Sequence, residues 1–73
     1  VAQLRAREAT LTGEVARLES RLGDQHPELR RARGELVDIR SQIQREIDRV
    51  MSSLESDVQA ARSRLASLEA SQS

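Results

Sequence analysis

The sequence contains no phenylalanine, tyrosine or tryptophan, and no cysteine. Globular cores normally use aromatic side chains because each buries a large apolar area, so their absence favours a thin helical seam. Stacking on sugars or nucleic-acid bases is also disfavoured, because it needs flat rings. Without cysteine the chain has no disulfide staple, and no cluster of metal ligands is evident. We therefore expect neither a metal nor another cofactor.

Long apolar runs and an excess of one charge are also missing. No run approaches the ~20 apolar residues that span a bilayer, so we expect no direct membrane contact within this segment. The twelve basic residues, all Arg, balance twelve acidic ones. A net charge of zero creates no long-range field for nucleic acid. The 73 residues begin with Val1 rather than Met, which suggests a piece of a longer protein that depends on partners for stability.

The first segment, residues 1–22, has the heptad spacing of apolar residues that is typical of a coiled-coil helix. Arg, Glu, Gln and Ala fill most other positions and favour helix. Glu8 occupies the one missing seam position. It either fixes the register, as a buried polar residue does in coiled coils, or reaches solvent at a frayed helix start. The predicted seam positions are Leu4, Leu11, Val15, Leu18 and Leu22.

Residues 23–27 predict the single break in the chain. We expect Gly23 to end the first helix, because glycine adopts positive φ without strain. Pro27 disfavours helical geometry at His26 and suits the first position of a helix. Stop and start signals this close together predict a tight turn between antiparallel helices. The predicted turn residues are Gly23, Asp24, His26 and Pro27.

The second segment, residues 28–71, is one long amphipathic helix without an internal proline. Its first half has apolar residues at helical spacing, which we expect to pair with the first helix. The fold class is thus all-α: an antiparallel two-helix coiled-coil hairpin with a longer second helix, completed by oligomerisation. The predicted seam positions here are Leu29, Ala32, Leu36, Ile39, Ile43, Ile47 and Val50.

The second helix continues beyond the reach of the first. Folding about the turn brings Leu4 close to Ile47 or Val50, where the first helix ends. The apolar stripe nevertheless continues, and a solvated helix has no reason to keep one. Either a longer first helix or another chain covers it, so we expect a homo-oligomer or flanking helices of the parent protein as partners. The predicted oligomer or partner interface is Leu54, Val58, Ala61, Leu65 and Leu68.

No catalytic pattern is present. The sequence has no nucleophile–base pair, paired-carboxylate cleft, Gly-rich phosphate loop or metalloprotease spacing, so we expect no enzyme activity in this segment. His26 is the only histidine, and we expect it to cap the second helix and shape the turn. The basic run Arg30, Arg31 and Arg33 is interpreted as a solvated face, with Arg31 paired to glutamates one helical turn away.

Residues 18–29 (LESRLGDQHPEL) and 39–47 (IRSQIQREI) resemble the periplasmic coiled coil of the polysaccharide co-polymerases, also called chain-length determinant proteins (the Wzz, GumC and ExoP group). That family has a tyrosine-glycine, two residues, histidine-proline turn between helical stretches, which Gly23, His26 and Pro27 match. Residues 67–70 (SLEA) resemble its small residue, leucine-glutamate ending. Leu22 stands where the family often has an aromatic residue.

The resemblance implies a bacterial inner-membrane protein whose coiled coil projects into the periplasm. Several copies would form a ring that sets polysaccharide chain length or couples polymerisation to export, with the polymerase or export machinery as partner. A cytoplasmic tyrosine kinase is fused in some members, and no catalytic residue is implied here. Two other functions stay open: the periplasmic helical hairpin of a secretion adaptor, and a generic coiled-coil scaffold.

Overall fold

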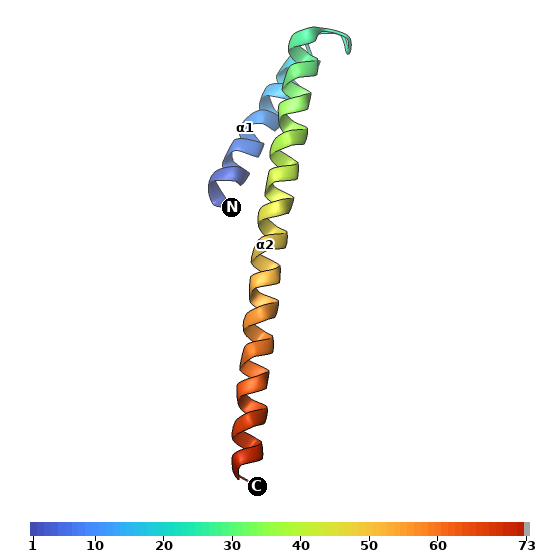
Figure 1. The fold of residues 1–73 in the computed structure, drawn as a ribbon. Helices are drawn as coiled ribbons and strands as arrows, with labels where there is room; N and C mark the ends of the chain where they lie inside the picture. Colours follow the sequence, from blue (N-terminus) through green and yellow to red (C-terminus); the bar gives the residue numbers. More distant parts are fainter. Residues whose placement is uncertain (73) are drawn as a thin grey trace.

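The computed structural model describes residues 1–72 and shows an all-α hairpin of two unequal helices, α1 (Ala2–Glu19) and α2 (Pro27–Gln72) (Figure 1). The molecule measures 72 × 17 × 13 Å. The 46 residues of α2 set the long dimension, because a rise of ~1.5 Å per residue gives about 69 Å. The predicted fold class, a two-helix hairpin with a longer second helix, is confirmed.

The two helices share one narrow apolar seam. Its most enclosed side chain is Leu29, which is 0% exposed and lies just after the turn. Each buried aliphatic side chain contributes roughly 1.5–3 kcal/mol relative to an exposed one, so the seam holds the hairpin closed. The buried residues are Leu11, Val15, Leu18, Leu29, Ala32, Leu36, Ile39 and Ile43, with Leu4, Leu22 and Ile47 packed partly buried against them.

Val50 is a correction to the predicted seam. It is 40% exposed, whereas Ile47, one turn earlier, still packs against the core. The reason is the start of α1 at Ala2, which leaves no α1 side chain to cover Val50. Figure 1 shows α1 beside the turn-proximal part of α2 only.

The end of α1 differs from the prediction as well. The helix ends at Glu19 rather than at residue 22, and Ser20 is its C-cap. The Ser20 hydroxyl donates to the Arg17 carbonyl at 2.7 Å. The amides of Arg21 and Leu22 both donate to the Leu18 carbonyl, at 3.0 and 2.8 Å. These bonds satisfy the carbonyls of Arg17 and Leu18 without a left-handed residue.

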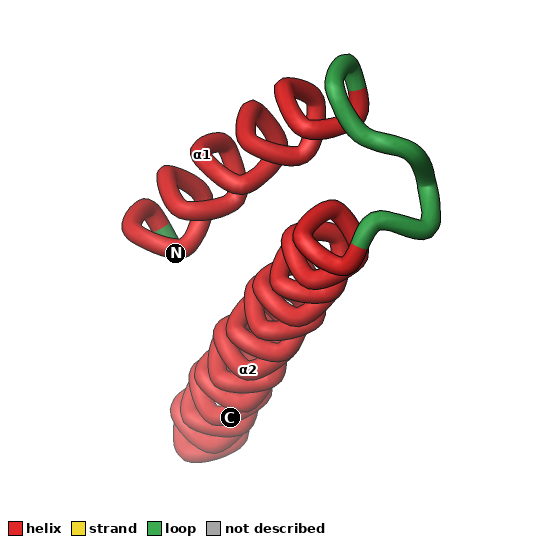
Figure 2. The backbone as a smooth tube through the Cα atoms, turned by 90° about the horizontal axis from the view of Figure 1, so that it is seen from above, coloured by secondary structure: helices red, strands yellow, loops and turns green. Residues whose placement is uncertain are grey.

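Gly23 therefore does not act as the predicted positive-φ helix stop, because no glycine among residues 1–72 has a positive φ. It begins a second turn instead, in which its carbonyl accepts a hydrogen bond from the His26 amide at 3.0 Å. This i to i+3 bond is that of a β-turn. Figure 2 shows the resulting loop bridging the ends of α1 and α2 at the tip.

The start of α2 matches the sequence interpretation. Pro27 is its first residue, where a missing N–H is no loss. The amide of Glu28 donates to His26 Nδ1 at 3.2 Å, and the Arg30 amide donates to the His26 carbonyl at 3.0 Å. His26 thus caps α2 with both its side chain and its backbone, as predicted.

Candidate functional site

The candidate site is the uncovered apolar face of α2. We call it the exposed stripe, which consists of Met51, Leu54, Val58, Ala61, Leu65 and Leu68. Leu54 is 52% exposed and Leu65 is 56% exposed. Every residue from 48 to 72 is exposed, so this half of α2 receives no cover from the rest of the described chain. All five predicted interface residues lie on this stripe, and Met51 extends it toward α1.

The exposed stripe lies on the same face of α2 as the seam. Ile43, Ile47 and Leu54 follow one another at intervals of four and seven residues, which keeps them on one side of a helix with 3.6 residues per turn. Ile43 is buried and Ile47 is partly buried under α1. A helix seated on the stripe would therefore continue the seam in line with α1.

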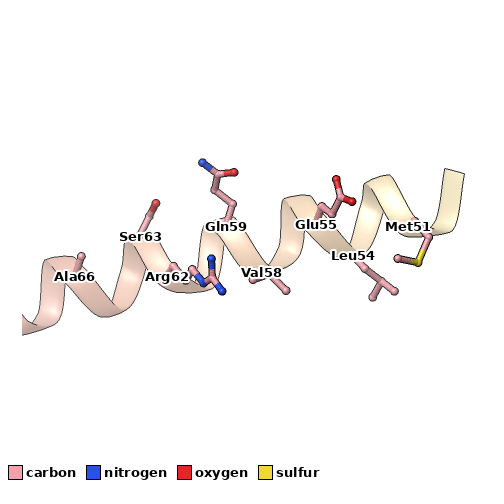
Figure 3. Close-up of a pocket in the computed structure, with 8 residues that line it drawn as sticks. All are labelled: Met51, Leu54, Glu55, Val58, Gln59, Arg62, Ser63 and Ala66. Atoms are coloured by element: carbon pink, nitrogen blue, oxygen red, sulfur yellow. The ribbon is translucent and has the colours of Figure 1, made fainter. Parts of the chain in front are cut away.

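The surface around the stripe is an open helix face rather than a cavity. Figure 3 shows eight residues between Met51 and Ala66, all of them on α2. Leu54 and Val58 point to one side of the helix, while Gln59 and Ser63 point to the other. Ligand pockets enclose most of a small molecule. A face with no second wall suits another helix better.

Charged residues flank the stripe on both edges. With Leu54, Ala61 and Leu68 at heptad position d, Glu55 and Arg62 occupy position e. Asp57 and Arg64 occupy position g on the opposite edge. Residues at e and g border the apolar layers of a coiled coil and form ion pairs between helices. Glu69 also lies at position e, so one edge of the stripe has two acidic residues and one basic residue, and the other edge has one of each.

The covered part of the hairpin already contains an ion pair between the two helices. Glu8 accepts hydrogen bonds from Arg5 at 3.1 Å and from Arg40 at 3.2 Å. Its side chain is 21% exposed, so Glu8 is not the buried polar residue of the register interpretation, and it lies inside α1 rather than at a frayed helix start. These hydrogen bonds lower the pKa of the Glu8 carboxyl, because they stabilise its charged form.

The tip of the hairpin is held by Arg33 rather than by Arg31. Arg33 lies 3.5 Å from a Glu19 carboxylate oxygen and 3.3 Å from one of Asp24. It thus links α2 to the end of α1 and to the turn. Among residues 1–72, Arg31 makes no ion pair with either neighbouring glutamate, so that predicted pairing is wrong. The predicted turn residues Gly23, Asp24, His26 and Pro27 all lie exposed at this tip.

Chemistry-bearing groups do not converge elsewhere in the described chain. No group of three or more His, Asp or Glu residues within residues 1–72 is arranged to hold a metal ion. Arg49 donates hydrogen bonds to Glu46 and lowers the pKa of that carboxyl, a solvated pair within one helical turn. Neither helix of residues 1–72 is apolar enough over a sufficient length to cross a membrane.

Sequence reasoning missed the cross-helix pairs of Arg40 and Arg33, because the partners are far apart along the chain. The length of the turn and the heptad positions of the two helices together predict that Glu8 lies opposite Arg40.

Comparison of the chain with protein-family profiles, curated proteins and solved structures finds no match.

Proposed function

We propose that this chain is a structural assembly element in which the exposed stripe packs against another helix of the same assembly. The single observation behind the proposal is that the apolar face of α2 continues over residues 51–68, beyond the part of α2 that α1 covers. Helices in water are marginal unless an apolar face packs against a neighbour. Burial of the stripe would stabilise the second half of α2 in the same way that packing against α1 stabilises the first half.

We further propose that the assembly is an inner-membrane exopolysaccharide chain-length determinant or export protein, with this hairpin in the periplasm. The support is the resemblance of residues 18–29 and 39–47 to that family. In the hairpin, His26 caps α2 and Pro27 begins it, which gives the histidine-proline pair a local structural role. The proposed partners are further copies and the polysaccharide polymerase or export machinery.

A secretion-adaptor hairpin is the second candidate, favoured by the elongated antiparallel shape with helices of unequal length. The two candidates differ in the sequence around the hairpin. Transmembrane segments on both sides indicate a chain-length determinant. One N-terminal span followed by lipoyl-like β repeats indicates a secretion adaptor.

The test changes the stripe in the intact protein of the producing bacterium. Replacing Leu54 and Leu65 together by Gln removes two apolar layers without adding charge. Val37→Gln is the matched control, because Val37 is 62% exposed and lies off the stripe. We expect the double variant to lose chemically crosslinked oligomers and to change the length distribution of the surface polysaccharide, while the control changes neither. An unaltered oligomer in the double variant would refute the assembly role.

A further inference from the structure

We infer that the exposed stripe pairs with the same stripe of a second copy of this chain, as a parallel, in-register coiled coil. The inference rests on the proposed function and names the partner that covers the stripe. It follows from the heptad spacing of residues 51–68, from the places of the charged residues around α2, and from the short length of α1.

The stripe has a strict heptad of its own, offset by one residue from that of the seam. Steps of seven residues after Ile43 would lead to Asp57 and Arg64, which are charged. The apolar residues come one position later instead. A strict seven-residue repeat is the spacing of a left-handed coiled coil, and a β-branched residue at a with leucine at d favours two parallel strands. Met51, Val58 and Leu65 occupy position a, and Leu54, Ala61 and Leu68 occupy position d.

The charged residues in this half of α2 all border the stripe. Positions b, c and f between residues 51 and 72, which face away from it, contain only Ser, Gln and Ala. A helix that needs only a solvated surface places its charges on that outer face. Charges restricted to positions e and g are those that reach a partner helix in a coiled coil. They are Glu55, Asp57, Arg62, Arg64 and Glu69.

Ion pairing within α2 does not explain these charges. Glu55, Asp57, Arg62 and Arg64 have no oppositely charged residue three or four positions away, which is the spacing of ion pairs within a helix. Arg49, nearer the seam, does have such a partner in Glu46. The charges that border the stripe are therefore placed for contacts with another helix.

The parallel, in-register pair gives these charges opposite partners. Position g of one helix then approaches position e of the other, five residues later. Asp57 meets Arg62 of the second copy, and Arg64 meets Glu69. Two-fold symmetry repeats each contact. No like charges meet in this register, because Glu55 faces Val50.

A parallel pair shifted by one heptad has the opposite pattern. Asp57 of one copy then meets Glu69 of the other, while in the reverse direction Asp57 meets Glu55 and Arg64 meets Arg62. No opposite charges meet at positions e and g in that register. Like charges in contact destabilise a pairing. The edges of the stripe thus favour the in-register pair.

An antiparallel pair is disfavoured on two grounds. It would bring Asp48 close to Glu69 of the second copy, two acidic residues, when Leu54 faces Leu65. It would also require copies of opposite polarity. Copies that project from one membrane, as in the proposed function, present their α2 helices with the same polarity.

The length of α1 leaves room for the parallel pair. α1 covers α2 as far as Ile47, and the stripe begins one turn later. Helices of a left-handed coiled coil cross at about 20°. Two α2 helices that cross at Ala61 are therefore displaced sideways by about 13 Å at Leu36, which lies about 37 Å nearer the turn. Packed helices lie about 10 Å apart, so each α1 stays on its own α2 and passes beside the second copy.

The test uses the full 73-residue chain with charge reversals. We expect D57R alone and R62E alone each to weaken the homodimer by about tenfold, because each places like charges together twice. An equimolar mixture of the two variants should pair as tightly as wild type, because both contacts become opposite in sign. E55R is the matched control, since Glu55 faces Val50 and its reversal should leave the dissociation constant unchanged. Dissociation constants come from sedimentation equilibrium.

The same variants distinguish the two directions of pairing. In an antiparallel pair Glu55 would meet Arg62, so E55R would weaken the dimer, and Asp57 would meet Arg64, so the mixture would not restore it. Nitroxide labels on Ser71→Cys should lie within about 20 Å of each other in the parallel dimer, against about 35 Å in the antiparallel one.

Three results would overturn the parallel pairing: the longer label distance, a mixture of D57R and R62E that stays weak, or a wild-type chain that is monomeric at all concentrations. The proposed function fails separately. If the Leu54 and Leu65 double variant still abolishes oligomers of the intact protein, the assembly role stands and only this partner assignment fails.

Discussion

Arg40 Nε donates a hydrogen bond to Glu8 Oε2 at 3.2 Å and joins α1 to α2 across 32 residues of sequence. Arg5 approaches the other carboxylate oxygen of Glu8 at 3.1 Å. Glu8 occupies the one seam position of α1 that is not apolar, so the ion pair replaces a hydrophobic layer there. A shift of either helix by one turn would separate Glu8 from Arg40, so the pair favours the register that the apolar seam sets.

Glu8→Gln is expected to lower the melting temperature of the hairpin at neutral pH, with an effect that shrinks in acid. The folded-state pKa of Glu8 lies below its unfolded value. Its stabilising contribution is therefore present above the unfolded pKa and is lost as pH falls through the folded pKa. Circular dichroism at one protein concentration, at about pH 7 and about pH 3, measures the difference between variant and wild type. A difference that is the same at both pH values would contradict this role.

His26→Ala is expected to destabilise the hairpin by about 1 kcal/mol, because the Glu28 amide loses its acceptor. His26→Asn is the matched control, since asparagine is a strong N-cap residue and should retain most of the stability. Urea unfolding followed by circular dichroism measures both variants. Equal destabilisation by Ala and Asn would show that the imidazole acts through something other than capping.

The glycines give a third test. Gly13 and Gly34 lie within helices, and a Cβ at either position would meet nothing within 4 Å. Alanine at each should stabilise the fold by about 1 kcal/mol. Gly23 also has open space and no positive φ, so Gly23→Ala should be tolerated or stabilising by about 0.4–1 kcal/mol. A marked loss of stability in Gly23→Ala would restore its role as a left-handed helix stop.

Much of the fold follows from local signals in the sequence. The apolar spacing identifies both helices and the residues of the seam, because a helix repeats its face every 3.6 residues. The start of α2 at Pro27 can be predicted because proline disfavours helical geometry at the residue before it, which is a local effect. The end of α1 was harder to place, because Ser20 and Leu18 close the helix through hydrogen bonds that glycine placement does not reveal.

The ion pairs depend on tertiary geometry instead. Arg33 has no acidic residue three or four positions away on its own helix, and it pairs with Glu19 and Asp24 across the tip. Which ion pair forms depends on the angle between α1 and α2, which the turn sets. Apolar spacing alone predicts Val50 in the seam, whereas the start of α1 at Ala2 determines how far α1 covers α2 and leaves Val50 outside. The exposed stripe can be predicted without tertiary geometry, because α1 is too short to reach residues 51–68.

The two halves of α2 should respond differently to truncation. Leu29→Ala removes a fully buried side chain and should destabilise the hairpin by about 2–5 kcal/mol. Leu54→Ala removes one that is 52% exposed, and should leave the unfolding free energy of the dilute monomer nearly unchanged. Urea unfolding at low protein concentration compares them. A comparable loss from Leu54→Ala in the monomer would mean that the stripe is covered within the chain.

Sedimentation equilibrium of the wild-type chain beside the Leu54 and Leu65 double glutamine variant tests the central claim, that the exposed stripe is an assembly surface. We expect concentration-dependent association of the wild type and a monomer for the variant, with helix content falling in the wild type on dilution. A wild-type chain that stays a fully helical monomer over the whole concentration range would contradict it.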